Sequence, residues 1–227
     1  MSFNIAIDGP AGAGKSTIAK AIAKKLQVIY VDTGAMYRAM ALFMIREGVD
    51  ADDAAAISDK CVEADITIGY ENDEQVVYLN GENVNAYLRT EEVGNMASAT
   101  SVQPAVRKKL VELQQALAAK NDCIMDGRDI GTCVLPNAQV KVYLTASSEV
   151  RAKRRFDELT EKGLECDFDK IKADIEERDY RDMNREHSPL KQADDAVLVD
   201  SSFMTIDEVI NAIVEMCNCS KKVNEEK

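Results

Sequence analysis

The sequence predicts an α/β fold of three layers, in which helices cover a central parallel sheet. Three observations lead to this prediction. Short apolar runs alternate with helical patterns from the N-terminus, further apolar runs follow along the chain, and 46% of the 227 residues are hydrophobic. A chain of this length and composition can form one large core with a smaller insertion.

The first part of the chain alternates strands and helices. Residues 3–8 (FNIAID) and 28–32 (VIYVD) are apolar runs typical of buried strands. A helical pattern follows each of them, at residues 16–26 (STIAKAIAKKL) and at residues 34–47. This order of strand, helix, strand and helix is the reason to expect parallel strands.

Residues 66–88 interrupt the alternation. ITIGY and QVVYL are typical of two short strands separated by ENDE, and Asn80-Gly81 is the strongest turn signal in the chain. We therefore expect a small antiparallel insertion on the parallel core.

The remaining elements complete the predicted core. Residues 101–120 predict a helix with Pro104 near its start, and residues 123–126, 140–145 and 196–200 predict further core strands. Residues 147–187 predict two charged helices split by EKGLECD. We expect the last helix to end near residue 218, with a frayed tail after it.

Composition and charge exclude several classes of function. The formal net charge of −12 disfavours binding to nucleic acid, and it requires any anionic ligand to be met by local positive side chains. The chain starts without a signal peptide pattern, and no apolar run reaches the ~20 residues that span a bilayer. We therefore expect no membrane contact, a cytoplasmic location and, since nothing demands a partner chain, a monomer.

The cysteines and the histidine give no sign of a metal site. None of the six cysteines forms a CxxC pair, and the one histidine leaves no Cys/His set for zinc. Reduced thiols are the expectation for such a chain.

Residues 9–16 (GPAGAGKS) fit the phosphate-binding pattern G-x-x-x-x-G-K-[ST], the P-loop. Its glycines let backbone N–H groups point at phosphate oxygens, and the following helix presents its positive N-terminal end. A merely flexible glycine turn is the alternative, but this stretch follows a predicted strand and opens a predicted helix. We therefore expect a P-loop NTPase-like fold that binds ATP through Gly9, Pro10, Ala11, Gly12, Ala13, Gly14, Lys15, Ser16 and Thr17.

Two oxygen-bearing residues are candidates for binding Mg²⁺. Ser16 closes the P-loop pattern, and Asp126 ends the strand CIMD in the place of a Walker B acid. A strand-end cap is the alternative for Asp126. No protein-kinase, GTPase or helicase signature follows, which favours a compact kinase for a small acceptor.

The stretch ERDYRDMNR (177–185) carries arginines at 178, 181 and 185, which would form one stripe on a helix. One interpretation is a solvated surface on which Glu177 pairs with Arg181. The other is a grip on phosphate, because phosphoryl transfer between anions needs positive forks around the transferred group. Further candidates for such a grip are Arg38, Arg107, Arg128, Arg151, Arg154 and Arg155.

No histidine lies near these motifs to act as a general base. A phosphate monoester as acceptor needs none, because its second pKa is about 6 and its oxygen is already ionised at pH 7. His187 is therefore expected to be incidental.

Several separated segments together resemble the bacterial cytidylate kinases (CMP kinases), a family of nucleoside monophosphate kinases. The likeness runs from about residue 4 to residue 213. It is carried by IAIDGPAGAGKST, DTGAMYRA (32–39), RTEEVGNMASATSVQPAVR (89–107), DGRDIGT (126–132), and ERDYRDMNRE with SPL (177–190).

The resemblance implies an activity and a division of the chain. The activity is transfer of the γ-phosphoryl group of ATP to CMP or dCMP. The division is a core of about 1–60, 90–147 and 188–218, a monophosphate-binding insertion of about 61–89, a lid with its flanking helices at about 148–187, and a tail at 219–227.

The resemblance also implies roles for individual residues. Lys15, Arg128 and Arg185 would be catalytic. Arg38, Arg128 and Arg185 would hold the acceptor phosphate with Thr33 nearby, Arg178 and Asp182 would meet the sugar, and Ser98, Arg107 and Asp129 would read the base.

Base chemistry agrees with the last set. Cytosine offers an N4 amino donor, which Asp129 can accept, beside N3 and O2 acceptors, to which Arg107 can donate. Uracil would place an acceptor against Asp129, at a cost of roughly 1–3 kcal/mol, so CMP and dCMP are expected over UMP. Two rivals stay open: a P-loop kinase for an acceptor such as shikimate or gluconate, and a module that binds ATP without chemistry.

Overall fold

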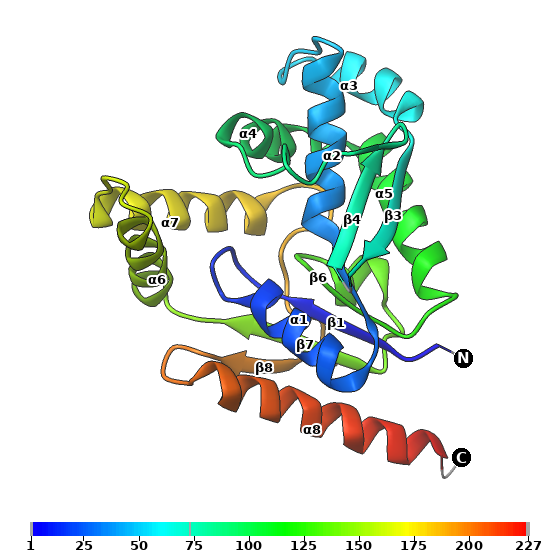
Figure 1. The fold of residues 1–227 in the computed structure, drawn as a ribbon, viewed down its shortest axis with the longest axis vertical. Helices are drawn as coiled ribbons and strands as arrows, with labels where there is room; N and C mark the ends of the chain where they lie inside the picture. The colour runs from blue at the N-terminus through cyan, green and yellow to red at the C-terminus, as the bar shows by residue number, and fades with distance from the viewer. Residues whose placement is uncertain (1, 73, 226–227) are drawn as a thin grey trace. The chain divides into compact units, whose positions relative to one another are not determined.

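The computed structural model describes residues 2–72 and 74–225 and divides into two compact units (Figure 1). The first unit holds the chain up to Tyr30 and from Asn121 onward, and the second holds Val31–Lys120. No helix in the described part of the chain is both long enough and apolar enough to cross a bilayer.

A parallel sheet forms the base of the first unit, as predicted, although its strand at residues 29–32 continues past Tyr30 into the second unit. Among the described residues this sheet has five strands in the order β2-β6-β1-β7-β8. β1 pairs in parallel with β6 and with β7, and β7 pairs in parallel with β8. The strands are β1 (Asn4–Asp8), β2 (Ile29–Asp32), β6 (Cys123–Gly127), β7 (Val140–Thr145) and β8 (Val197–Asp200).

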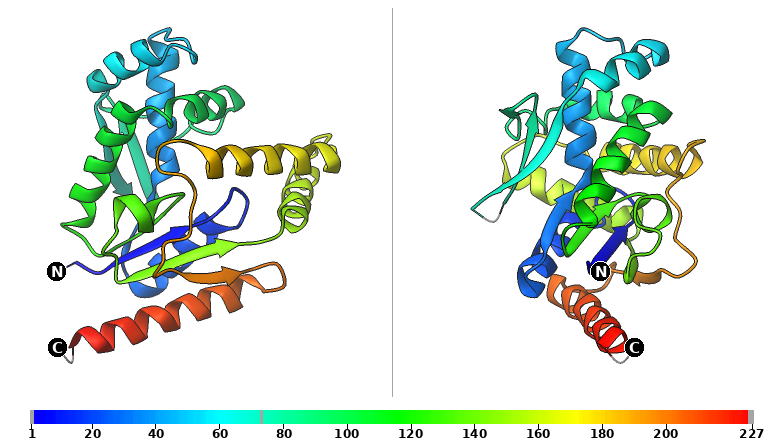
Figure 2. Two further views of the ribbon diagram at one scale, coloured as in Figure 1. Left: turned by 180° about the vertical axis from the view of Figure 1, so that it is seen from behind. Right: turned by 90° about the vertical axis from the view of Figure 1, so that its right-hand side faces the viewer.

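Helices α1 (Lys15–Leu26) and α8 (Ile206–Glu225) share one apolar core with this sheet, and Figure 2 shows α8 running beside it. Ile22 of α1 and Ile213 of α8 are both fully buried in that core. The expected helix end near residue 218 is wrong, since α8 continues to Glu225. Ser220 donates to the carbonyl of Gln139, and the Lys221 ammonium lies 4.9 Å from the Phe3 ring centre, so tertiary contacts hold this last turn. The last part of the predicted tail, residues 226–227, lies outside the described residues.

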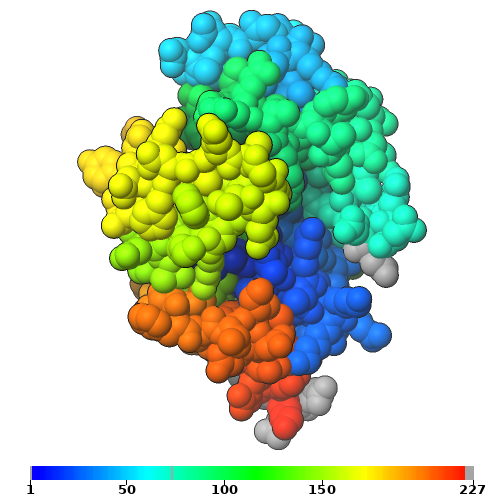
Figure 3. All heavy atoms as spheres, turned by 60° about the vertical axis from the view of Figure 1, so that its left-hand side comes forward, coloured from blue at the N-terminus to red at the C-terminus, as the bar shows by residue number. Residues whose placement is uncertain are grey.

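The two charged helices form a pair within the first unit. They are α6 (Ser148–Glu161), capped by Ser147, and α7 (Phe168–Asn184), capped by Asp167. Phe156 and Phe168 meet edge to face with ring centres 6.2 Å apart. In Figure 3 the atoms of this pair (yellow-green to yellow) lie against those of the N-terminal segment (dark blue). A π-helical turn, Ile130–Val134, follows β6, and no sequence pattern had indicated it.

The second unit combines helices with a small antiparallel sheet. The sheet has the order β3-β4-β5, with β3 (Ile66–Glu71), β4 (Glu74–Leu79) and β5 (Glu82–Asn83). Asn80 and Gly81 both have positive φ, 50° and 82°, which confirms the predicted turn. The expected turn at ENDE includes residue 73, which lies outside the described residues. The helices are α2 (Thr33–Arg46), α3 (Ala54–Lys60), a 3₁₀ turn at Cys61–Glu63, α4 (Glu91–Thr100) and α5 (Pro104–Ala118).

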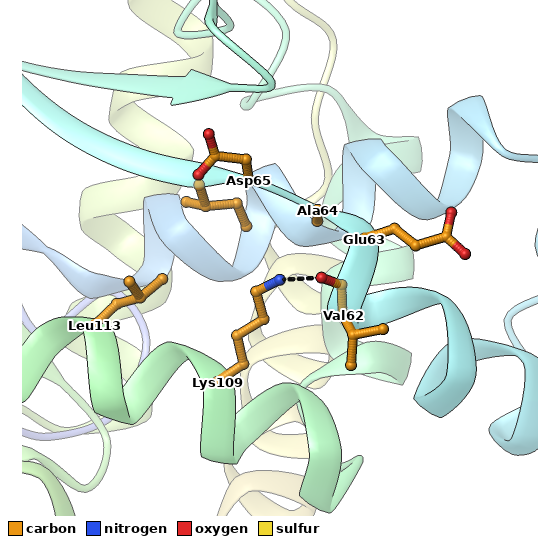
Figure 4. Close-up of a pocket in the computed structure, with 7 residues that line it drawn as sticks. Val62, Glu63, Ala64, Asp65, Lys109 and Leu113 are labelled. Carbon is orange, nitrogen blue, oxygen red and sulfur yellow. Dashed lines mark hydrogen bonds between the residues drawn. The ribbon is translucent and has the colours of Figure 1, made fainter.

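A surface pocket of about 220 Å³ lies within the second unit (Figure 4). Lys109 of α5 and the chain around Val62 line it, and the Lys109 ammonium donates to the Val62 carbonyl over 2.8 Å. None of the residues predicted to bind a nucleotide lines this pocket.

Candidate active site

The predicted phosphate loop connects β1 to α1 in a conformation that depends on glycine. Gly9, Gly12 and Gly14 all have positive φ, at 147°, 75° and 88°. A Cβ on Gly9 would lie 1.9 Å from the carbonyl oxygen of Leu144, so only glycine allows the loop to approach β7 this closely. Gly14 precedes α1 and makes no side-chain cap to the first-turn N–H groups, which suits an anion at this helix end.

The Lys15 side chain folds back over the loop. Its ammonium donates to the carbonyls of Gly9 and Pro10, both over 2.7 Å, and the residue is 6% exposed. Burial lowers the pKa of Lys15, and the positive charge of Arg128 lowers it further. A phosphate bound here would oppose both effects.

Asp126 is the second-last residue of β6, inside the same unit, and the hydroxyls of Ser16 and Tyr30 donate to it. The Ser16 hydroxyl donates to Oδ2 over 2.9 Å, and the Tyr30 hydroxyl donates to Oδ1 over 2.8 Å. Asp126 is 5% exposed. Hydroxyl and carboxylate oxygens are the donors that Mg²⁺ prefers, so the Ser16–Asp126 pair fits that ion.

Arg128 and Asp182 form an ion pair within the first unit. The Arg128 Nε donates to Asp182 Oδ2 over 2.8 Å. Burial raises the pKa of Asp182, but the charge and hydrogen bond of Arg128, with the charges of Arg178 and Arg185, outweigh it and lower the pKa overall. Three of the predicted phosphate and sugar contacts therefore gather around this carboxylate.

Arg185 does not continue the expected arginine stripe. Helix α7 ends at Asn184, and Arg185 is extended, with φ −65° and ψ 142°. Its Nη2 lies 3.5 Å from Asp129 Oδ1, and its Nε donates to the Ser188 carbonyl. Arg181 instead is exposed and lies 3.7 Å from Glu177, as the surface interpretation expected. The stripe thus divides into a surface residue, Arg181, and an inward residue, Arg185.

In the second unit, Asp32 organises the start of α2. It caps the helix by accepting from the Ala35 N–H over 2.9 Å, and it accepts from Arg38 Nη2 over 3.2 Å. A Cβ on Gly34 would lie 3.2 Å from Asp32 Oδ1 and 3.3 Å from Arg38 Nη1, so this pair needs a small residue beside it. Thr33 is buried at the first position of the same helix.

The other predicted residues of the second unit lie on α4 and α5. Arg107 is 6% exposed, donates to the Ser101 carbonyl, and its guanidinium carbon lies 5.7 Å from the Tyr37 ring centre. Ser98 is exposed and donates to the Gly94 carbonyl. The predicted base contacts are therefore divided: Ser98 and Arg107 belong to the second unit and Asp129 to the first.

Asp8 is a buried acid at this site that the sequence analysis did not single out. Its two oxygens accept the N–H groups of Ile130 and Gly131, both over 2.7 Å, so it holds the start of the π-helical turn. Burial raises the pKa of Asp8 to about 6, although these two bonds act in the opposite direction. The available signal was an acid immediately before the P-loop glycine, at the end of an apolar strand.

A phosphate loop after the first strand of a parallel sheet, followed by clustered arginines, defines a phosphotransferase of the P-loop kinase class. The chain belongs to the cytidylate kinase family, whose model matches residues 5–219.

Relatives support this assignment over nearly the whole chain. The chain is 50% identical over 220 residues to the cytidylate kinase of Lactobacillus johnsonii, covering 97% of this chain and 96% of that protein. It is 49% identical over 212 residues to the cytidylate kinase of Listeria innocua, covering 93% and 94%. Among solved structures, a gluconokinase from Sinorhizobium meliloti 1021 has a TM-score of 0.50 and 13% identity, covering 99% and 97%. That likeness extends to the fold alone.

Proposed function

We propose that this protein transfers the γ-phosphoryl group of ATP to CMP or dCMP, giving ADP and CDP or dCDP. Membership of the cytidylate kinase family supports the proposal. One observation carries it: the Lys15 ammonium folds over the phosphate loop and donates to the Gly9 and Pro10 carbonyls over 2.7 Å, with the charge of Arg128 near enough to act on it. Two such cations beside a phosphate loop repel each other until an anion binds between them.

The nucleotide-binding half of the proposal rests on the first unit. The loop from Gly9 to Thr17 holds the ATP phosphates, with N–H groups of the loop and of the first turn of α1 as donors. Ser16 and Asp126 hold the accompanying Mg²⁺, whose charge offsets that of the phosphate oxygens.

Lys15, Arg128 and Arg185 stabilise the charge on the group being transferred. Each presents donors to phosphate oxygens, and the arginines do so as planar forks. The acceptor phosphate is already ionised at neutral pH, so no residue has to remove a proton. His187, which is exposed, has no part in the reaction.

The residues proposed to recognise the acceptor are those that the family resemblance implies. Arg38, Arg128 and Arg185 hold the acceptor phosphate with Thr33, and Arg178 and Asp182 meet the sugar. Ser98, Arg107 and Asp129 read the cytosine by accepting from N4 and donating to N3 and O2. Asp129 lies 3.5 Å from Arg185, so a proposed base-reading residue is paired with a proposed phosphate-binding residue.

The division of the chain expected from the sequence belongs to this proposal. Residues of about 61–89 form the monophosphate-binding insertion, and those of about 148–187 form the lid that excludes water from ATP. The protein acts as a cytoplasmic monomer on small nucleotides and not on nucleic acid. Sedimentation analysis at micromolar concentration tests whether the protein is a monomer. The same measurement with a DNA oligonucleotide tests whether it binds nucleic acid.

A coupled assay of ADP release with several acceptors tests the proposed activity. CMP and dCMP should be turned over well, UMP more weakly, and AMP, gluconate and shikimate not at all. Turnover of gluconate or shikimate without CMP would support the rival kinase. Binding of ATP without ADP release for any acceptor would support the binding module. Chelation of divalent cations should abolish ADP release with every acceptor that is turned over.

A further inference from the structure

Arg151 of α6 is a buried cation that contacts three separate segments of the first unit. It is 5% exposed. Its Nε donates to the Ala146 carbonyl after β7, and its Nη1 donates to the Ala11 carbonyl in the phosphate loop, both over 2.9 Å. Its Nη2 donates to Asp179 on α7. All three guanidinium nitrogens are therefore committed, each to a different segment.

The contact with Ala11 determines how one peptide of the phosphate loop is oriented. In a planar trans peptide the C=O and the following N–H point in opposite directions. Because Arg151 draws the Ala11 oxygen towards itself, the Gly12 N–H points away from Arg151. The stem of Arg151 also lies beside Gly12, since a Cβ on Gly12 would be 3.5 Å from the Arg151 Cβ and 3.8 Å from its Cγ.

The contact with Asp179 extends this link to the predicted acceptor residues. Asp179 is 9% exposed, and its second oxygen, Oδ1, has no hydrogen-bond partner among the described residues. This buried carboxylate therefore depends on Arg151 for compensation of its charge. Asp182 follows three residues later on α7, on a neighbouring face of the helix, and accepts from Arg128.

We propose that Arg151 is a positioning residue that joins the phosphate loop to α7, so that ATP affinity and the order of the acceptor-side helix depend on one guanidinium. This inference rests on the proposed function, because it assumes that the loop binds ATP. It makes no assumption about the acceptor. It differs from a direct lid contact with ATP, because Arg151 acts through the Ala11 peptide and Asp179.

Equilibrium binding of ATP with Mg²⁺ to the full chain, measured by calorimetry without acceptor, tests the link. Arg151→Met should raise the Kd for ATP about tenfold or more, because it removes a charge-assisted bond to the loop. Arg151→Lys keeps the charge but cannot reach three segments at once, and should raise the Kd at least threefold. The matched control is Lys153→Met, which removes an exposed cation of α6 whose contacts, with Asp157 and the Phe156 ring, both lie on its own helix.

The expected result for the control is a Kd within twofold of the wild type. If both Arg151 variants also stay within twofold, the proposal is wrong. Circular dichroism and thermal melting establish whether each variant is folded. If Arg151→Met does not fold, Arg151→Lys and Asp179→Asn decide the question, and both should weaken ATP binding.

Hydrogen exchange supplies a readout that a purely structural role would not change. In the wild type, ATP should slow amide exchange in α7 between residues 178 and 184 by at least threefold. In folded Arg151→Lys at saturating ATP, that protection should be lost. Equal protection in both proteins would overturn the link. Neither readout involves CMP, so failure of CMP turnover would refute the proposed function without touching this inference.

Discussion

Asp182 accepts a hydrogen bond from Arg128 Nε over 2.8 Å, which ties helix α7 to the segment that follows β6. Asp32 accepts from Arg38 in the same way in the second unit. Each of these arginines is predicted to bind the acceptor phosphate, and each is oriented by a carboxylate of the protein itself. Such pairing keeps the fork of an arginine in place before a ligand arrives.

Replacing Asp182 by Asn should therefore loosen Arg128 and weaken the binding of CMP more than that of ATP. We expect the KM for CMP to rise about tenfold, because an ion pair between two charged groups becomes a hydrogen bond from Arg128 to a neutral amide. The KM for ATP should change less than threefold. Steady-state kinetics with each substrate varied in turn measures both values. A larger effect on ATP than on CMP would contradict this account of Asp182.

Replacing Arg185 by Ala should slow phosphoryl transfer by about 10²–10³-fold, because it removes a positive fork from the transferred group. Arg181→Ala is the matched comparison, since Arg181 is exposed and its partner is Glu177, 3.7 Å away on the same helix. It should change kcat less than twofold. Equal loss in the two variants would restore the single-stripe interpretation.

Replacing Lys15 by Met should separate activity from stability. The transfer rate should fall about 10²–10³-fold or more, because the loop loses its phosphate-facing charge. The free energy of unfolding should rise, because burial of Lys15 disfavours its charged form, as the lowered pKa indicates. Urea unfolding of both proteins at pH 7 measures the difference. A clear loss of stability would mean that the two loop carbonyls compensate the ammonium fully.

Asp8 should give the protein a pH dependence near 6. Its pKa rises from 3.8 to about 6 on folding, so the folded state binds more protons than the unfolded state between these values. The contribution of Asp8 to stability is therefore greatest below about pH 4 and falls as pH rises to about 6, by about 3 kcal/mol in total. Unfolding measured against pH, with Asp8→Asn as the reference, should show this difference.

The activity should depend on pH in the opposite direction, and fall as the pH is lowered. Only the ionised Asp8 accepts from both Ile130 and Gly131 without competition from a proton. We expect kcat/KM of the wild type to fall as pH decreases through about 6, and that step to be absent in Asp8→Asn. A matching step in the variant would assign it to another group, such as the acceptor phosphate.

The phosphate loop and the parallel sheet were predictable because their signals are contiguous. Nine neighbouring residues, from Gly9 to Thr17, make up the loop, and β1, β6 and β7 bury most of their own apolar runs. The sequence analysis did not predict helices α3 and α4, although each has an N-cap signal in the sequence. Thr90 and Asp53 are N-caps whose side chains accept from the Val93 and Ala56 N–H groups, and both are residues that favour that position.

The errors at helix ends have a different cause. Pro189 stops the helix beyond Arg185 but does not set its end at Asn184, and the extended backbone of Arg185 accompanies contacts with Asp129, which is remote in the chain, and with Ser188. The continuation of α8 likewise involves Gln139 and Phe3, which are remote in the chain. Local patterns hold no information about such partners. The same reason hid Asp8, whose two N–H donors lie more than a hundred residues away in the chain.

The close approach of Gly9 to the Leu144 carbonyl has a consequence for mutational tolerance. Loop glycines often accept alanine at a modest loss, because the chain can relax into solvent. At position 9 the obstacle is backbone of the central sheet, so relief would have to come from the sheet itself. A saturation library of the loop should consequently lose all function at the codon for Gly9.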